Sequence, residues 1–145
     1  MPVLSPTKWN PNDKGTGVTL DSNGLDATSN HYISGAVRTI HRASSGKYYV
    51  EFKGPNNYIM VGVATEDATM VGSSAYPGGT AKSWSIYFYN GTKHHNDIAS
   101  PYFPRALLAT DVLGIALDMD AKTISGYLNG VSPGVMYSDL PSTLL

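Results

Sequence analysis

The sequence contains no cysteine and few charged residues. Of 145 residues, 14% are Asp, Glu, Lys or Arg, and the formal net charge is -1. The absence of cysteine excludes disulfides and thiolate metal sites. A charged fraction below the usual value of about 25%, with the two signs balanced, leaves no basic stripe for nucleic acid and no polybasic patch for a membrane surface. We therefore predict neither nucleic acid nor a membrane as a partner.

The sequence also lacks long apolar runs and helical patterns. No run approaches the about 18 apolar residues that span a bilayer. The opening Met-Pro-Val-Leu-Ser-Pro has neither the basic nor the apolar region of a signal peptide. No window repeats apolar residues at i, i+3, i+4 and i+7 with a capping residue. Little or no helix is expected.

What the sequence does contain is a series of short β-rich runs separated by turns. Apolar residues alternate along these runs, and 15 Gly and 9 Pro interrupt the chain. Asn90-Gly91 and Asn129-Gly130 have the sequence of tight hairpin turns. The spacing predicts an all-β sandwich or barrel. The expected strands, about ten in number, cover residues 18–20, 25–28, 37–40, 47–52, 58–63, 83–89, 92–95, 112–118 and 123–128 and the run that ends at Met136.

Two segments are poor in strand signals. Residues 66–82 and 97–110 contain several Gly and Pro residues and exceed the length of an ordinary hairpin connection. We therefore expect two long loops there. Long loops on a rigid scaffold often carry binding residues.

Several runs together resemble a SPRY domain. The matching residues are 46–52, 61–65, 84–89, 111–118, 123–130 and 139–141, and their order and spacing cover roughly residues 35–141. The resemblance implies a concanavalin-like jelly roll, a sandwich of two bent antiparallel sheets. We expect an N-terminal arm or linker over residues 1–8 and a single domain over residues 9–145.

The two ends of the sequence carry further expectations. Residues 9–14, Trp-Asn-Pro-Asn-Asp-Lys, followed by a hairpin, are similar to SPRY-like modules of phage and prophage tail proteins. Members of the family usually continue beyond the Asp-Leu-Pro segment, here residues 139–141, through another strand or two. We therefore expect the last strands to be supplied by the N-terminal hairpin or a neighbouring subunit, or the chain to be a fragment, because an unpaired apolar edge is a liability.

Catalytic and metal-binding groups are sparse. Glycosidases need two flanking carboxylates, but the two Glu residues are Glu51, which lies within an expected strand, and Glu66. Asp118 and Asp120 have the spacing of calcium ligands but not the rest of a calcium loop, so we interpret them as turn residues. His94 and His95 would point to opposite faces of a strand. We predict no catalytic activity, no metal site and no cofactor.

Aromatic residues provide the strongest sign of binding. Ten Tyr and two Trp offer rigid contact area with a polar group, and by alternation Tyr49, Phe52, Trp84, Phe88 and Tyr127 belong to the core. In the SPRY family the partner surface is formed by loops at one end of the sandwich, which points to the loops around residues 30–35, 72–82 and 97–106. Arg105 is suited to bidentate contact with a carboxylate or an acidic sugar, although an ordinary surface arginine is the alternative. The candidate ligand-binding residues, for which capping of the core is the rival role, are His31, Tyr32, Tyr76, Tyr102, Phe103 and Arg105.

These observations lead to three functional hypotheses. The first is a phage tail-fibre or virion domain that attaches to a host surface glycan or protein, with a homo-oligomer such as a trimer raising avidity. The second is a virion assembly or decoration protein with no ligand. The third is an adaptor of the cellular SPRY type that binds peptides. The expected location is the virion for the first two and otherwise the cytoplasm.

Overall fold

The structure is a computed structural model that describes residues 7–29, 35–54, 58–72 and 75–144. In these residues it contains twelve β-strands and no helix. Consequently no helix in the described part of the chain is long and apolar enough to cross a membrane. The all-β prediction is confirmed.

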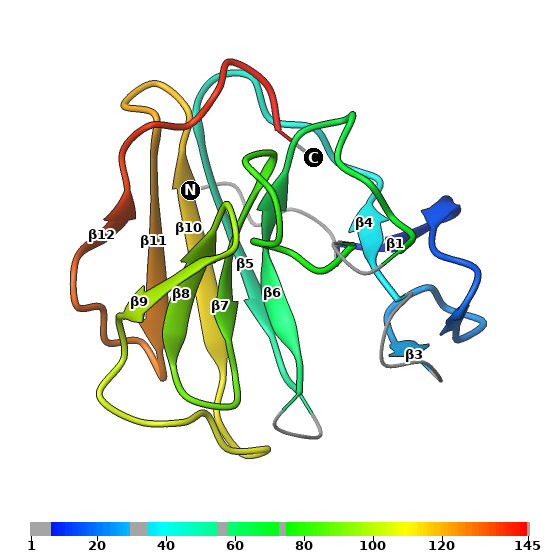
Figure 1. The fold of residues 1–145 in the computed structure, drawn as a ribbon, viewed down its shortest axis with the longest axis horizontal. Helices are drawn as coiled ribbons and strands as arrows, with labels where there is room; N and C mark the ends of the chain where they lie inside the picture. The colour runs from blue at the N-terminus through cyan, green and yellow to red at the C-terminus, as the bar shows by residue number, and fades with distance from the viewer. Residues whose placement is uncertain (1–6, 30–34, 55–57, 73–74, 145) are drawn as a thin grey trace.

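Two four-stranded antiparallel sheets pack against each other (Figure 1). The first has the order β12-β11-β10-β5 and the second the order β6-β7-β8-β9. Apolar side chains from both sheets meet in one core, as expected for a β-sandwich. The strands of the first sheet are β5 (Lys47–Phe52), β10 (Leu113–Asp118), β11 (Thr123–Leu128) and β12 (Val135–Tyr137), and those of the second are β6 (Met60–Ala64), β7 (Ser83–Tyr87), β8 (Thr92–His95) and β9 (Ile98–Pro101).

Turn residues set the register of the hairpins. Asn129 and Gly130 both have positive φ, 51° and 83°, which confirms the tight turn predicted for Asn-Gly. The residues between β10 and β11 also form the predicted turn, since the Asp118 carboxylate accepts hydrogen bonds from the backbone N–H groups of Asp120 and Ala121. Gly91 has a φ of 73°, and a Cβ atom there would lie 2.2 Å from the carbonyl oxygen of Arg105, so glycine is required.

One expected loop contains a strand. Residues 97–110 were predicted to be a long loop, but β9 occupies part of that segment and pairs with β8. Asn96 and Asp97, with φ of 52° and 60°, form the two-residue connection. The prediction was wrong because the Asn-Asp dipeptide was not read as a turn, although both residues tolerate the left-handed conformation.

The core is closed on one side of the sandwich and open on the other. Ile86, Phe88 and Ile115 are 0–2% exposed. By contrast, several apolar side chains of the edge strands β5 and β6 are only half-buried, among them Phe52 and Val63, whereas Val61 of β6 belongs to the core. Trp84 and Phe88 are core residues as predicted. The core comprises Ala43, Val61, Trp84, Ile86, Phe88, Phe103, Leu107, Leu113, Ile115, Leu117, Met119, Ile124, Met136, Leu140 and Leu144.

Two tyrosines predicted in the core lie outside it. Tyr49 is 38% exposed and makes an edge-to-face contact with Tyr127 at a centroid distance of 5.9 Å. The Tyr49 ring lies beside Gly114, where a Cβ atom would come within 2.1 Å of the Tyr49 hydroxyl. The alternation of side chains along β5 therefore places Tyr48 and Val50 inward and Tyr49 on the outer face.

The N-terminal strands form two small sheets of their own. β1 (Trp9–Lys14) pairs with β4 (Val37–Thr39), and β2 (Val18–Leu20) pairs with β3 (Ala27–Ser29). These sheets join neither four-stranded sheet and lie beyond β6, on the far side of the molecule from β9 and β12 (Figure 1).

The uneven core predicts uneven mutational costs. Phe88→Ala should lower the free energy of unfolding by about 3–5 kcal/mol, the usual cost of emptying a fully buried aromatic site. Phe52→Ala should cost less than half as much, because its ring already borders open space. Urea denaturation of the two variants checks the difference, and equal losses would contradict a core that is open at β5.

Candidate functional site: an open cleft between two strand edges

The outer edges of β5 and β6 lie on the same side of the sandwich, and neither edge pairs with a strand of the described residues. Met119 donates to the carbonyl of Gly46, and the β10–β5 register continues from there. Since hydrogen-bonded and non-bonded positions alternate in antiparallel pairs, the backbone groups of Lys47, Tyr49 and Glu51 point away from β10. No hydrogen bond joins these groups to another strand among the described residues.

The edge of β6 follows the same rule. Phe88 donates to the carbonyl of Ile59, and the register of β6 with β7 then directs Met60, Gly62 and Ala64 away from β7. These backbone groups likewise have no strand partner in the described part of the chain. Within residues 7–29, 35–54, 58–72 and 75–144, the two sheets therefore present two rows of backbone donors and acceptors without a strand partner on one side.

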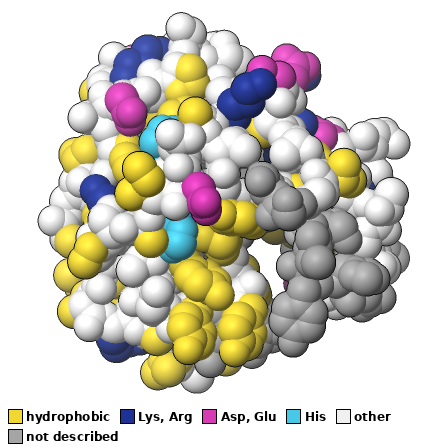
Figure 2. Space-filling model, viewed as in Figure 1, with side chains coloured by type: hydrophobic (Ala, Val, Ile, Leu, Met, Phe, Trp, Pro, Cys, Tyr) yellow, Lys and Arg dark blue, Asp and Glu magenta, His cyan; other side chains and the backbone are white. Residues whose placement is uncertain are grey.

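An apolar cleft of about 160 Å³ lies between these edges. On the face drawn in Figure 2, hydrophobic side chains border a hollow beside the part of the molecule that carries β1 to β4. We call this space the β5–β6 cleft. Its apolar walls are Tyr48, Val50 and Phe52 from β5 and Met60, Val61 and Val63 from β6, with Ile115 and Leu117 behind them.

The outer wall of the β5–β6 cleft comes from the N-terminal segment. Val37, Thr39 and Ala43 line it. The rings of Trp9 and Phe52 lie 5.9 Å apart, which joins this wall to the end of β5. The cleft is also bordered by the C-terminal segment, where Ala43 and Leu144 exchange two backbone hydrogen bonds of 2.8 Å.

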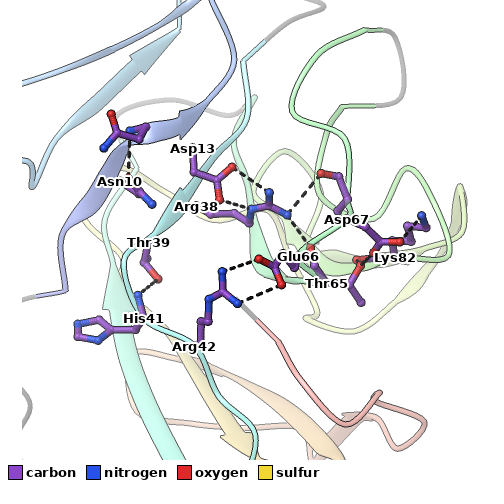
Figure 3. A network of polar contacts seen from close by, with 12 residues as sticks. Asn10, Asp13, Arg38, Thr39, His41, Arg42, Thr65, Glu66, Asp67 and Lys82 are labelled. Atoms are coloured by element: carbon purple, nitrogen blue, oxygen red, sulfur yellow. Dashed lines mark hydrogen bonds and ion pairs between the residues drawn. The ribbon is translucent and has the colours of Figure 1, made fainter.

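Arg38 fastens the outer wall to the sandwich (Figure 3). Arg38 is 9% exposed, and its guanidinium donates two hydrogen bonds of 2.8 Å to the carboxylate of Asp13 on β1. It also donates to the carbonyls of Thr65 and Ala68, at 2.5 and 3.4 Å, in the loop after β6. One buried charge thus connects β1, β4 and the second sheet with bidentate geometry.

Two further ion pairs at the same rim are exposed to solvent. Arg42 pairs with Glu66 at 2.5 Å, and both side chains are more than half exposed. Lys82 pairs with Asp67, whose carboxylate also accepts a hydrogen bond from the Thr65 hydroxyl. These two contacts, that of Lys82 being the larger influence, lower the pKa of Asp67. Exposed pairs of this kind add little stability, and of these four residues only Arg42 lines the cleft.

One predicted ligand-binding residue lies at the β5–β6 cleft. Tyr76 lines it, together with Pro77 and Thr80 of the same loop. The Tyr76 hydroxyl donates to the Asp97 carboxylate, and this hydrogen bond, with burial, raises the pKa of Tyr76. Its hydroxyl is therefore held in place and its ring forms part of the rim. His31 and Tyr32 lie outside the described residues.

Three other predicted residues are grouped along β11 and the loop before β10. The Tyr102 hydroxyl accepts from the Gly126 N–H at 2.9 Å and donates to the Gly134 carbonyl at 2.5 Å. Phe103 is 6% exposed and belongs to the core. Arg105 holds the buried Asp111 carboxylate through hydrogen bonds of 2.6 and 3.0 Å. These contacts are structural, and ligand binding by the three residues stays a prediction.

The residues considered for catalysis or metal binding are occupied by structural contacts. Glu51 accepts a hydrogen bond from the Tyr49 hydroxyl, and Glu66 pairs with Arg42. His94 contacts Tyr87, whereas His95 stacks on the buried Trp84 at 4.6 Å, so the two imidazoles point to opposite faces as predicted. In the described part of the chain no group of three or more His, Cys, Asp or Glu side chains is placed to hold a metal ion.

Sequence reasoning missed Arg38 and the apolar walls of the cleft. The available signal for Arg38 was a charged residue inside a predicted strand, Val-Arg-Thr, because a charge in a strand is rarely buried unless it is paired. The apolar residues of β5 and β6 that line the cleft could not be recognised in the same way, because an edge strand and an inner strand show the same alternation of apolar and polar residues.

Comparison with known proteins identifies the family. The SPRY domain family matches residues 47–145. The chain is 30% identical to Ran-binding protein 10 of Danio rerio over 154 residues, which covers 96% of this chain and 24% of that protein. It is 29% identical to Ran-binding protein 9 of Homo sapiens over 157 residues, covering 96% of this chain and 20% of that protein. The chain thus spans about a quarter or less of the length of these relatives.

Solved structures give the same fold. The SPRY domain of human HERC1 superposes with a TM-score of 0.76 at 22% identity, covering 94% of this chain and 85% of that one. The TRIM65 PSpry domain gives a TM-score of 0.71 at 16% identity, covering 97% and 84%. The resemblance to a SPRY domain is confirmed. The resemblance to phage tail modules is not supported, because the relatives found are Ran-binding proteins.

Arg38→Ala should release the outer wall while leaving the sandwich folded. Removing Arg38 leaves the Asp13 carboxylate, whose side chain is 26% exposed, without its charged hydrogen-bond partner, at a cost of about 1.5–3 kcal/mol. We expect backbone amides of β1 to exchange with deuterium at least about tenfold faster, since each 1.4 kcal/mol corresponds to tenfold, and those of β10 and β11 to be unchanged. Arg42→Ala is the matched control and should have little effect, because its pair with Glu66 is exposed. Equal effects of the two variants would contradict the role assigned to Arg38.

Asp111 should make stability depend on pH. Its buried carboxylate accepts hydrogen bonds from Arg105, the Leu108 N–H and the Asn129 side chain, and the Arg105 guanidinium is the main cause that holds the pKa of Asp111 well below its usual range. Its stabilising contribution is complete above the unfolded value of about 3.9 and is lost as the pH falls below it.

Asp111→Asn tests this contribution. At pH 7 it should lower the free energy of unfolding by about 1–3 kcal/mol. The difference between wild type and variant should shrink steadily below about pH 4. Urea unfolding across pH 3 to 7 measures it, and a difference that stays constant would disprove the role of the charge.

Proposed function

We propose that this chain, which belongs to the SPRY domain family, binds a segment of a partner protein at the β5–β6 cleft and catalyses no reaction. The SPRY domain is a protein-interaction module, so the open question is which surface engages the partner. The single observation that carries the proposal is the apolar cleft of about 160 Å³ between the two sheets, with the Arg42–Glu66 ion pair at its rim.

The walls of the cleft suit recognition of a protein segment. Binding sites are typically concave and mainly apolar, with a few fixed polar groups that give orientation. Met60, Met70 and Phe52 supply the apolar surface, and methionine adapts to side chains of different shape. Tyr76 and the Arg42–Glu66 pair supply fixed polar groups at the rim. This arrangement supports the cellular adaptor hypothesis over attachment to a host glycan.

Photo-crosslinking tests the proposed site. A photoreactive phenylalanine analogue at position 70, at the rim of the β5–β6 cleft, should crosslink to partner proteins in lysate of the source organism, and mass spectrometry should identify a recurring peptide segment. The same analogue at Val131 is the matched control, because Val131 is 72% exposed in the turn after β11, away from the cleft. Crosslinking of the same segment with equal yield at both positions, or at neither, would count against the proposal.

A further inference from the structure

We infer that the N-terminal part of the chain is a flap that opens and closes over the β5–β6 cleft, and that Arg38 holds it closed. The N-terminal flap comprises the described residues 7–29 and 35–40, which carry β1 to β4. Among the described residues its strands pair only with one another, and it lies beside the two large sheets (Figure 1). The inference goes beyond the proposed function, because it concerns a wall of the cleft and holds for any occupant.

The first basis is the small number of contacts that join the flap to the sandwich. Its backbone hydrogen bonds outside the strand pairs, such as that from Gly15 to Ala36, have both partners within the flap. Apolar burial beside Arg38 is small, because the buried residues that line the cleft there, Ala36 and Ala68, each carry only a methyl group. The ring contact between Trp9 and Phe52 adds one larger apolar contact. Elements held by few contacts open more readily than a packed core.

The second basis is the geometry of Arg38 (Figure 3). Its Nε and Nη2 atoms donate to the two carboxylate oxygens of Asp13, which also belongs to the flap. Its Nη1 atom donates to the sandwich, at 2.5 Å to the carbonyl of Thr65 and at 3.4 Å to that of Ala68. Opening therefore breaks the two hydrogen bonds of Nη1, while the ion pair moves with the flap and leaves no buried charge unpaired.

The third basis is a hinge between the flap and β5. The flap leads into the sandwich through His41 and Arg42, which are both exposed and form no backbone–backbone hydrogen bond among the described residues. The next residue, Ala43, is fixed by two backbone hydrogen bonds of 2.8 Å with Leu144. Two exposed residues between a self-contained flap and a fixed position are suited to absorb the change in backbone angles that opening requires.

Opening of the flap controls access to the cleft. Val37 and Thr39 of the flap line the cleft, so displacement of the flap removes one of its walls. A ligand that requires the open flap binds with an affinity reduced by the fraction of molecules that are open. Changes at Arg38 therefore alter the binding of such a ligand without touching the ligand itself.

Thiol labelling measures the opening directly, because the chain contains no cysteine. Ala68→Cys places one thiol beside Arg38, at a position that is 8% exposed and lines the cleft. Ser85→Cys is the matched control, since Ser85 on β7 is 0% exposed and does not line the cleft. Without any partner, iodoacetamide should label the Ala68→Cys variant at least about tenfold faster than the Ser85→Cys variant, because the flap opens while the sandwich stays folded. Each rate is divided by the rate of the same variant in its urea-unfolded state.

Urea distinguishes opening of the flap from unfolding of the whole chain. The urea dependence of an opening reaction scales with the surface that the reaction exposes. Low urea concentrations should therefore change the labelling rate of the Ala68→Cys variant little and accelerate labelling of the Ser85→Cys variant steeply.

Variants of the ion pair test the role of Arg38. In the Ala68→Cys background, Arg38→Met keeps the apolar part of the side chain, and Asp13→Asn combined with it leaves no unpaired charge. The combined change should raise the labelling rate at least about tenfold, since it removes the charged hydrogen bonds to the sandwich. The same change in the Ser85→Cys background should have little effect. Arg42→Ala is the matched control and should change labelling less than about twofold, because its ion pair is exposed.

Three results would overturn the inference. The first is labelling of both thiols at equal normalised rates with equal urea dependence, because the flap would then open only when the sandwich unfolds. The second is a rate for the Ala68→Cys variant equal to that of its unfolded state, which would mean that the flap does not cover this position. The third is an equal effect of Arg42→Ala and of the combined change at Asp13 and Arg38. Crosslinking at position 70 tests the occupant and labelling tests the wall, so either proposal can fail while the other stands.

Discussion

The structure depends on the packing of β7 against β10 and β11. Ile86 of β7 and Phe88, which follows β7 directly, belong to one buried cluster with Leu113, Ile115 and Ile124 of the other sheet and have almost no solvent contact. Burial of this area is the main force that holds the two sheets together. This packing is concentrated at the inner strands. The extent of burial can therefore differ between the edge strands, and we expect the sandwich to form although β5 and β6 are less well packed.

The openness of the β5–β6 side follows from the path of the chain. The chain passes from β5 in the first sheet to β6 in the second through residues 53–59, so the two consecutive strands become edges on the same side. The segment around β4 lies across this side without pairing with either edge. Arg38 holds it there through Asp13 and the carbonyl of Thr65. The hydrogen bonds of the buried Arg38 therefore hold this segment against the sandwich, where strand pairing would otherwise do so.

Much of the fold could be predicted from the sequence because its signals are local. Alternation identified β5, β10 and β11, and Asn129-Gly130 fixed a turn. The errors had physical causes. Tyr49 was assigned to the core because an aromatic residue suits either face of a strand, but alternation along β5 puts Tyr48 and Val50 inward and leaves Tyr49 on the outer face, beside Gly114. The cleft could not be predicted, since whether β5 has one neighbour or two depends on residues far away in the sequence.

Unpaired strand edges usually favour aggregation, and proteins protect them with charges, proline or a covering segment. Here side chains of the N-terminal segment lie over the edge of β5, but among the described residues they form no backbone hydrogen bonds with it. Val37 and Ala43 lie across the cleft, yet the backbone groups of Tyr49 and Glu51 keep no strand partner in the described residues. A long flat edge open to solvent would accept any strand, whereas an edge behind a wall held by Arg38 admits only a segment that fits the apolar space. This combination of unused hydrogen-bonding capacity and restricted access favours selective binding over nonspecific association.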